Sequence, residues 1–270
     1  MKILVRNNCD NGTLGHFLLS VFRVVDLFNE DETMRRKRKF DIVFDSIYQG
    51  GSAFNCVVDQ TKSKEDPDII LEGHRRSPLL ENGGIMYNGE ILSKNSLTYK
   101  NLKKILSKVA FKKHIIKKVN NFFLKKLTDK TLGVHIRLTD MNYWHSEHGV
   151  YDFSHYLDKI NRIEKKYDKI FVSSDNYESI KKLKDIYGNK IIHYPNFKFK
   201  NETEDDYSFI SKTKQFADSE EAWIELFIEV LTLSKCKHLI GRNSAVSLSA
   251  ILFSNNMRLL NNHTLLSHGG

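Results

Sequence analysis

The sequence predicts an α/β fold built from two Rossmann-like domains that face each other across a cleft. In the second half of the 270-residue chain, short apolar runs typical of strands alternate with segments of helical periodicity, and the first half opens with a strand, a turn and a helix. Alternating strands and helices imply right-handed crossovers and a parallel sheet. A chain of this length can form two small domains, each with its own core. We therefore expect one domain at residues 1–128 and a second at residues 129–270.

The first domain is expected to begin with a strand at residues 3–5 and a helix whose apolar residues recur from residue 14 to residue 28. Gly12 and Gly15 stand where the backbone turns into that helix. A glycine-rich helix entry can receive a phosphate, but the dinucleotide fingerprint is incomplete, and we favour tight packing of the strand on the helix. A second strand is expected at residues 40–44. Residues 50–95 show little periodicity and are expected to be irregular.

The second domain has the clearer pattern of alternating elements. Its predicted strands are residues 131–137, 169–174, 191–194 and 238–241. Its predicted helices are residues 153–167, 180–186 and 220–233, with a further helix opening at residue 243.

The composition is that of a globular protein, with 40% hydrophobic and 28% charged residues. The formal charge of +9 favours anionic partners, among them nucleotides, membrane surfaces and nucleic acid. Cys9, Cys56 and Cys236 form no CxxC pair, which argues against a disulfide framework and favours a reducing compartment. The first residues fit a strand better than a signal peptide, and no run approaches the roughly 20 apolar residues of a membrane span. We expect a cytoplasmic protein that is soluble or at most peripheral at a membrane.

Residues 99–127 have a helical pattern in which lysines from Lys103 to Lys126 fill many of the positions between apolar residues. Such a stretch can lie on an anionic membrane or follow phosphates. A connecting helix pair with a solvent-exposed outer face is the interpretation that we favour, and peripheral membrane contact is the alternative. The basic run at residues 35–39 is better explained as a solvated loop, and no nucleic-acid partner is expected.

The most informative segment is Gly133-Val-His-Ile-Arg-Leu-Thr-Asp140. Side chains alternate along a strand, so Val134 and Ile136 are expected on one face and His135 and Arg137 on the other. Arg137 then stands at the carboxyl end of the strand, where ligands bind in open α/β sheets. Its planar fork of donors suits a phosphate, and an arginine beside apolar neighbours needs an anionic partner. We expect Arg137 to bind a diphosphate, and an internal salt bridge is the alternative.

Four segments in this order resemble the GDP-fucose-dependent fucosyltransferases, above all the α1,6-fucosyltransferases and the bacterial nodulation fucosyltransferases. They are GVHIRLTD, a strand ending FVSSD, the acidic helix through IEVLTLSKCKHLIG, and the serine-rich helix start NSAVS. The resemblance covers roughly residues 112–255 and implies a GT-B-like arrangement of the two domains. It also implies that residues 129–270 bind the nucleotide-sugar donor and that residues 1–128 lie on the acceptor side.

The resemblance assigns roles to the residues of the first two segments. Arg137 matches the arginine that holds the donor's diphosphate, His135 matches its partner histidine, and Asp140 is the acidic residue that closes the motif. Asp175 falls at a strand end near the nucleotide. The alternatives are a hydrogen bond within the sheet for His135, a turn cap for Asp140 and the N-cap of the following helix for Asp175.

The last two segments supply the other donor-binding candidates. Glu229 stands where the family has an aspartate positioned for guanine or its ribose, and the solvent edge of its helix is the alternative that we favour. Ser244, with Ser247 as a neighbour, lies at the helix start that meets phosphate in these enzymes. Backbone N–H groups and the helix dipole favour an anion at such a position.

The chemistry implied by the resemblance is inverting transfer of fucose from GDP-fucose to a glycan hydroxyl. Such a reaction needs neutralisation of the charge that develops on the diphosphate and a base for the acceptor hydroxyl. The family carries a carboxylate a few residues beyond its arginine motif, so Glu147 is the first candidate base, followed by His145 and His148. The alternative is that all three belong to a surface loop.

No acidic pair follows an apolar strand in the way that metal-dependent transferases require. Asp66 and Asp68 precede an apolar run, and residues 204–206 lie in a polar segment. We therefore expect a metal-independent enzyme without a cofactor, as the resemblance also implies. The alternatives are a transferase for another nucleotide sugar, a non-catalytic nucleotide- or glycan-binding module, and a basic polyanion-binding protein.

Overall fold

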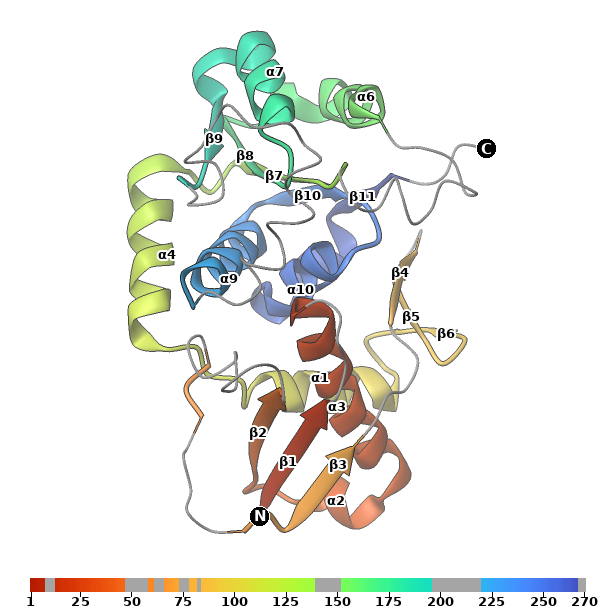
Figure 1. Cartoon of the computed structure of the whole chain (residues 1–270). Coiled ribbons are helices and arrows are strands. Elements are labelled where there is room, and N and C mark those ends of the chain that lie inside the picture. The colour runs from red at the N-terminus through yellow and green to blue at the C-terminus, as the bar shows by residue number, and fades with distance from the viewer. Residues whose placement is uncertain are drawn as a thin grey trace. The chain divides into compact units, whose positions relative to one another are not determined.

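The chain forms two compact units in the computed structural model (Figure 1). The N-terminal unit comprises Met1–Leu79 and Gly84–Ile116, and the C-terminal unit comprises Leu80–Gly83 and Lys117–Gly270. The division falls inside a helix, and the boundary expected from the sequence lies just beyond the end of that helix. The structure describes residues 1–7, 13–46, 58–60, 66–72, 78–81, 84–138, 152–195 and 220–266.

The N-terminal unit is built on a parallel three-stranded sheet in the order β2-β1-β3, in which Ile3 pairs with Ile42 on one side and Ile69 on the other (Figure 1). Helix α1 packs its apolar face against this sheet. The ring centroids of Phe17 in α1 and Phe44 in β2 are 4.9 Å apart. The elements in chain order are β1 (Lys2–Asn7), α1 (Thr13–Glu30), α2 (Glu32–Arg36), β2 (Asp41–Ser46), β3 (Ile69–Glu72), β5 (Gly84–Tyr87), β6 (Glu90–Ile91), α3 (Leu97–Leu106) and the start of α4 (Lys113–Lys126). Strand β4 (Leu79–Glu81) begins in this unit at Leu79, and its other residues are assigned to the C-terminal unit.

The expectation that residues 50–95 are irregular was wrong for β3, β4, β5 and β6. Strand β3 is short and at the edge of its sheet, with Ile70 48% exposed, so it shows no sustained alternation. Strands β5 and β6 form an antiparallel hairpin whose two-residue turn is Asn88-Gly89, with φ of 52° and 83°. Asn-Gly is the strongest short-range signal for a hairpin, since both residues tolerate a positive φ.

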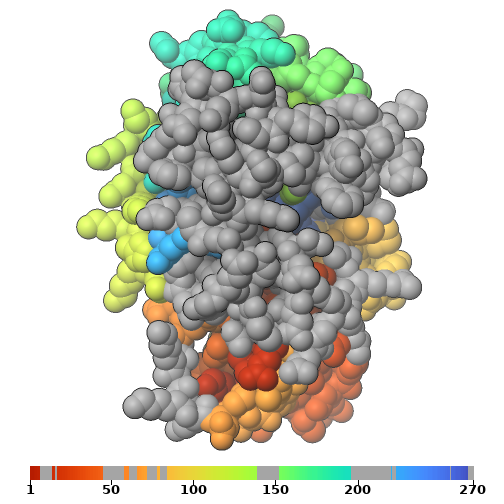
Figure 2. Space-filling view, viewed as in Figure 1, coloured from red at the N-terminus to blue at the C-terminus, as the bar shows by residue number. Residues whose placement is uncertain are grey.

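The lysine-rich segment forms two helices, as the favoured interpretation required. Between α3 and α4 the chain is extended at Phe111, which forms an isolated antiparallel bridge with Val58. Residues 107–112, between the two helices, contain no glycine or proline, so the sequence does not mark the break between them. The amine of Lys104 lies 5.0 Å from the ring of Phe28 and donates to the carbonyl of Arg35, so this lysine belongs to the packing of the N-terminal unit. Figure 2 shows side chains of α4, in yellow-green, projecting from the surface.

The C-terminal unit contains a five-stranded parallel sheet in the order β11-β10-β7-β8-β9. Its elements, besides the rest of α4, are β7 (Thr131–Ile136), α6 (Phe153–Ile163), the 3-10 turn η3 (Glu164–Lys166), β8 (Lys169–Ser174), α7 (Tyr177–Tyr187), the 3-10 turn η4 (Gly188–Lys190), β9 (Ile191–His193), α9 (Glu220–Lys235), β10 (His238–Gly241), α10 (Ala245–Phe253), the 3-10 segment η6 (Asn255–Asn261) and β11 (His263–Leu265). Strand β11 was not predicted, whereas the other four strands were.

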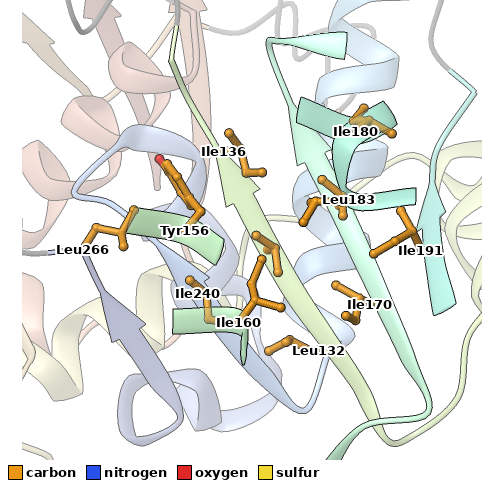
Figure 3. Close-up of a cluster of buried hydrophobic side chains, with 12 residues drawn as sticks. Leu132, Ile136, Tyr156, Ile160, Ile170, Ile180, Leu183, Ile191, Ile240 and Leu266 are labelled. Carbon is orange, nitrogen blue, oxygen red and sulfur yellow. The ribbon is translucent and has the colours of Figure 1, made fainter. Parts of the chain in front are cut away.

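Helices cover both faces of this sheet. Val134 and Ile136 point into an apolar cluster with Tyr156 of α6 and Leu183 of α7, and most of this cluster is labelled in Figure 3. Gly133, on the opposite face, packs against α9, where a Cβ would meet the side chains of Leu233 and Cys236 at 3.1 Å. The predicted alternation along β7 is therefore confirmed. Within the described residues, no helix is long and apolar enough to cross a membrane.

Candidate functional site

The order of strands in the C-terminal unit marks one place for a ligand. From β7 the chain moves to β8 and β9 on one side, and it then returns to β10 and β11 on the other side. In open α/β sheets, ligands bind beyond the carboxyl ends of the strands at such a switch point. The residues that follow β7 and β10 are therefore the ones to consider, and they include Arg137 and Ser244.

His135 joins β7 to the start of α10. The imidazole is only 4% exposed, and its Nδ1 lies 3.1 Å from Oγ of Ser247 and 3.2 Å from Oγ of Ser244. Ser244 is the N-cap of α10, and its hydroxyl accepts a hydrogen bond from the backbone N–H of Ser247. These two partners of His135 lie at the start of a helix. These bonds fix the amino terminus of α10 beside the end of β7.

Gly241, the last residue of β10, permits this close arrangement. A Cβ at that position would lie 2.5 Å from Oγ of Ser247 and 3.7 Å from Cβ of His135. Ser247 is fully buried, and its hydroxyl is already held by His135 and Ser244. The site therefore requires the absence of a side chain at Gly241.

Two arginines lie at the carboxyl ends of the central strands. Arg137 follows the last residue of β7 and is half-buried. Its backbone N–H donates to the hydroxyl of Tyr156 at 3.3 Å, and its carbonyl accepts from Nη1 of Arg242 at 3.4 Å. Arg242 follows β10 directly and is 4% exposed. Two arginines and the amino terminus of α10 thus lie at this edge of the sheet, and each of them favours an anion.

Arg242 was missed by the sequence analysis. The signal was present, because Arg242 follows an apolar strand in the same way as Arg137 follows β7. The rule applied to Arg137, that a cation at a strand end marks a ligand position, identifies it as well.

Asp175 supports the chain that leaves β7. Its carboxylate accepts from the backbone N–H of Leu138 at 3.0 Å, and its own N–H donates to the carbonyl of Ile136 at 3.4 Å. The N-cap of α7 is Asn176, whose side chain accepts from the N–H of Ser179, so the alternative of Asp175 as N-cap was wrong. Asp175 instead fixes the backbone next to Arg137.

Glu229 is buried, with 3% of its surface exposed, so the alternative of a solvent-edge glutamate was wrong. Its carboxylate accepts a hydrogen bond from the hydroxyl of Ser173 on β8 at 3.1 Å. Burial first, and then the negative charges of Glu225 and Glu229, raise the pKa of the Tyr194 phenol. A buried carboxylate thus lies close to β8 and Tyr194.

Several predicted residues lie outside the described part of the chain, namely Gly12, Asp140, His145, Glu147 and His148. Gly15 is described and lies in the first turn of α1. Among the atoms described, a Cβ at Gly15 would meet nothing within 4 Å, so these atoms give no support to tight packing at this glycine.

Asp66 and Asp68 do not form a metal site of the kind used by transferases. Both are exposed, and Asp68 accepts from the backbone N–H of Lys2 at 2.6 Å at the start of β1. Among the described residues, no three His, Cys, Asp or Glu side chains gather as metal ligands would. Metal independence stays a prediction.

Similarity to known proteins is found in structure and not in sequence. No protein-family model matches the chain, and no curated protein matches it. The fucosyltransferase NodZ from Bradyrhizobium matches with a TM-score of 0.52 and 11% identity over 93% of this chain and 92% of that one. The NodZ α-1,6-fucosyltransferase co-crystallised with GDP gives a TM-score of 0.51 and 11% identity, with the same shares of the two chains covered. The same enzyme soaked with GDP-fucose gives 0.51 and 12% identity over 93% of this chain and 91% of that one.

These matches show the fold. The chain has a fucosyltransferase-like fold, and the predicted GT-B-like α/β class is confirmed. Because the likeness extends over nearly the whole of both chains, it includes the first hundred residues, where the sequence resembles the family only in its opening turn and helix.

Proposed function

We propose that the protein is a glycosyltransferase that takes a sugar from a nucleotide-sugar donor, with GDP-fucose as the first candidate and a glycan hydroxyl as the acceptor. The observation that carries the proposal is the position of Arg137 at the switch point of a sheet in a fold shared with NodZ, which has been crystallised with GDP and soaked with GDP-fucose. The donor is assigned to the C-terminal unit on this basis.

The diphosphate is assigned to the edge formed by Arg137 and α10. A guanidinium offers paired donors to phosphate oxygens, and the first N–H groups of a helix favour an anion. Tyr156 and Arg242 hold the backbone of Arg137 from two sides, so the guanidinium starts from a fixed main chain. His135 supports the same edge through its bonds to Ser244 and Ser247.

The nucleoside is assigned to the region of Glu229 and Asp175. A carboxylate can accept hydrogen bonds from guanine N–H groups or from ribose hydroxyls. Glu229 is oriented by Ser173, and Asp175 lies at the end of the same strand, β8. The related enzymes have an aspartate where this chain has Glu229. Because glutamate is longer by one methylene group, the preference for guanine is the first property to test.

The reaction that we propose is inverting and independent of metal. The acceptor oxygen forms a bond to the anomeric carbon as the bond from that carbon to the diphosphate breaks, and the nucleoside diphosphate departs. Arg137 and the α10 amino terminus stabilise the charge that develops on the leaving group. Glu147, or else His145 or His148, takes the proton of the acceptor hydroxyl, and Asp140 completes the motif around Arg137.

Substitution of Arg137 tests the proposal. Removing a hydrogen-bonded cation from a phosphate site costs about 1.5–3 kcal/mol, so Arg137→Ala should weaken GDP binding by roughly tenfold or more in titration calorimetry. Arg162→Ala is the matched control, because Arg162 is an exposed arginine of the same unit that pairs with Asp158. Its GDP affinity should equal that of the wild type. Unchanged binding and transfer in Arg137→Ala would show that the diphosphate does not bind there.

The donor is identified by thermal stabilisation. A ligand that binds only the native state raises the melting temperature, and GDP or GDP-fucose should do so at concentrations where UDP and CMP conjugates do not. Stabilisation by UDP or CMP conjugates alone would replace GDP-fucose with another donor. Binding of GDP without any transfer or donor hydrolysis would favour a non-catalytic nucleotide-binding module.

A further inference from the structure

Helix α4 carries a cationic surface in the C-terminal unit that the proposed transferase site does not use. The surface consists of Lys117, Lys118, Leu124, Lys125 and Lys126, all exposed, and we name it the α4 lysine surface. The whole helix, Lys113–Lys126, contains no acidic residue. None of these four lysines has an ion-pair partner among the described residues. Figure 2 shows side chains of α4 projecting from the molecule.

Four residues of the α4 lysine surface form two rows, and the fifth, Lys126, is the exposed last residue of the helix. Lys117 and Leu124 are seven residues apart, as are Lys118 and Lys125, and a separation of two turns places each pair on one side of the helix. Each pair therefore spans about 10 Å along the axis. The buried side of the helix is formed by Val119, which is 1% exposed.

Leu124 is the unusual member of this surface. It is 80% exposed in the last turn of a lysine-rich helix, and no described element covers it. Exposed lysines alone fit a solvated face. An exposed leucine between them is unfavourable in water, and this cost is removed if the leucine is buried in a binding partner. Helices that lie in a membrane interface combine lysines with apolar side chains that enter the lipid, and Leu124 supplies one such side chain beside the lysines.

A neighbouring element extends the cationic area. Lys235, at the C-terminal end of α9, is exposed and places its amine 5.9 Å from the ring of Phe123 on α4. Lys237 follows and is also exposed. Two elements of the same unit therefore present lysines beside each other, with Asp129 as the first acidic residue after α4.

We propose that the α4 lysine surface docks on an anionic lipid bilayer, with the lysines at the headgroups and Leu124 inserted among them. A nucleic acid fits less well. The helix contains no arginine for paired phosphate contacts, and its aromatic side chains are engaged, since the ring of Phe122 lies 5.8 Å from Phe171 and 5.1 Å from Tyr194. The surface is separate from Arg137, and the inference does not depend on the proposed transferase activity.

Vesicle cosedimentation of the full chain tests this inference. With about 30 mol% phosphatidylserine in phosphatidylcholine, the protein should sediment, and with phosphatidylcholine alone it should not. Lys117→Gln with Lys118→Gln should reduce partitioning by about tenfold or more, since each lysine near an anionic surface contributes roughly fivefold. The matched control is Lys165→Gln with Lys166→Gln, two exposed lysines of η3 with the same loss of charge, which should bind like the wild type. If the control pair loses as much vesicle binding, the effect depends only on the net charge of the protein, and the proposal is wrong.

Leu124→Gln separates a bilayer from other polyanions. It keeps every charge of the surface, so binding to phosphatidylserine vesicles should fall severalfold while retention on a heparin column stays the same. If Leu124→Gln sediments like the wild type, or if RNA competes fully with vesicles, the surface binds polyanions and not membranes. GDP binding by these variants should match the wild type, which keeps this result distinct from that of the Arg137 experiment.

Discussion

Gly241 and Ser247 approach so closely that a Cβ on the glycine would lie 2.5 Å from the serine hydroxyl. Gly241 ends β10, and Ser247 lies in the first turn of α10, where its hydroxyl meets the imidazole of His135. The contact therefore links the two central strands of the sheet with the helix terminus assigned to the diphosphate.

Gly241→Ala should destabilise the protein by about 1–3 kcal/mol, because the added methyl group must displace a buried and hydrogen-bonded hydroxyl. Gly15→Ala is the matched control. Gly15 lies in α1, a Cβ there meets no described atom within 4 Å, and alanine is the better helix former by about 0.5–1 kcal/mol. Urea denaturation should therefore show opposite signs for the two substitutions. Equal stability of Gly241→Ala and the wild type would mean that Ser247 can move at no cost.

Arg242→Gln should weaken GDP binding although Arg242 is assigned only a positioning role. Its guanidinium supports the carbonyl of Arg137, and loss of a hydrogen bond from a charged donor costs about 1.5–3 kcal/mol. Lysine at position 242 retains the charge, so Arg242→Lys should recover part of the affinity. A purely structural role would lower the melting temperature and leave the dissociation constant for GDP unchanged, and calorimetry beside thermal denaturation separates the two outcomes.

Glu229→Gln should reduce the preference for GDP over UDP. The substitution keeps an oxygen that can accept from Ser173 but removes the charge that favours guanine N–H donors. Ser173→Ala instead leaves the carboxylate buried without that donor and should cost about 1–3 kcal/mol of stability. Competition binding with both nucleotides checks the first effect. A preference that is the same in Glu229→Gln and the wild type would place the base elsewhere.

Acid should destabilise the C-terminal unit through His238. Burial first, and then the charges of His263 and Lys166, lower the pKa of this imidazole to about 4, against 6.5 for an ordinary histidine. Between these values the unfolded chain binds a proton that the folded chain does not, so the stability present above pH 6.5 is lost as the pH falls toward 4. The His238→Asn variant has no imidazole to protonate at this position. As the pH falls from 6.5 toward 4, the wild type should lose stability that the variant does not lose, so the difference between their melting temperatures should shrink. A difference between the two proteins that stays constant with pH would contradict the assignment.

The sequence by itself determined the alternating elements of the C-terminal unit. Apolar runs fixed β7, β8, β9 and β10, and the side-chain alternation in β7 placed Val134 in the core and His135 on the other face. It also located Arg137 at a strand end and Ser244 at a helix start, because strand and helix boundaries depend on local patterns. The hairpin at Asn88-Gly89 was available from the same kind of local signal.

Only the tertiary structure decided which of these residues meet. Strand order is set by long-range pairing, and it brings β10 next to β7, so that Arg242 reaches Arg137 and His135 reaches Ser247 across more than a hundred residues. The packing of α9 on β8 buries Glu229 against Ser173, and the periodicity of neither segment predicts this contact. Strands β3 and β11 are short and lie at sheet edges, and because a neighbouring strand rather than their own apolar pattern specifies them, they emerged only with the fold.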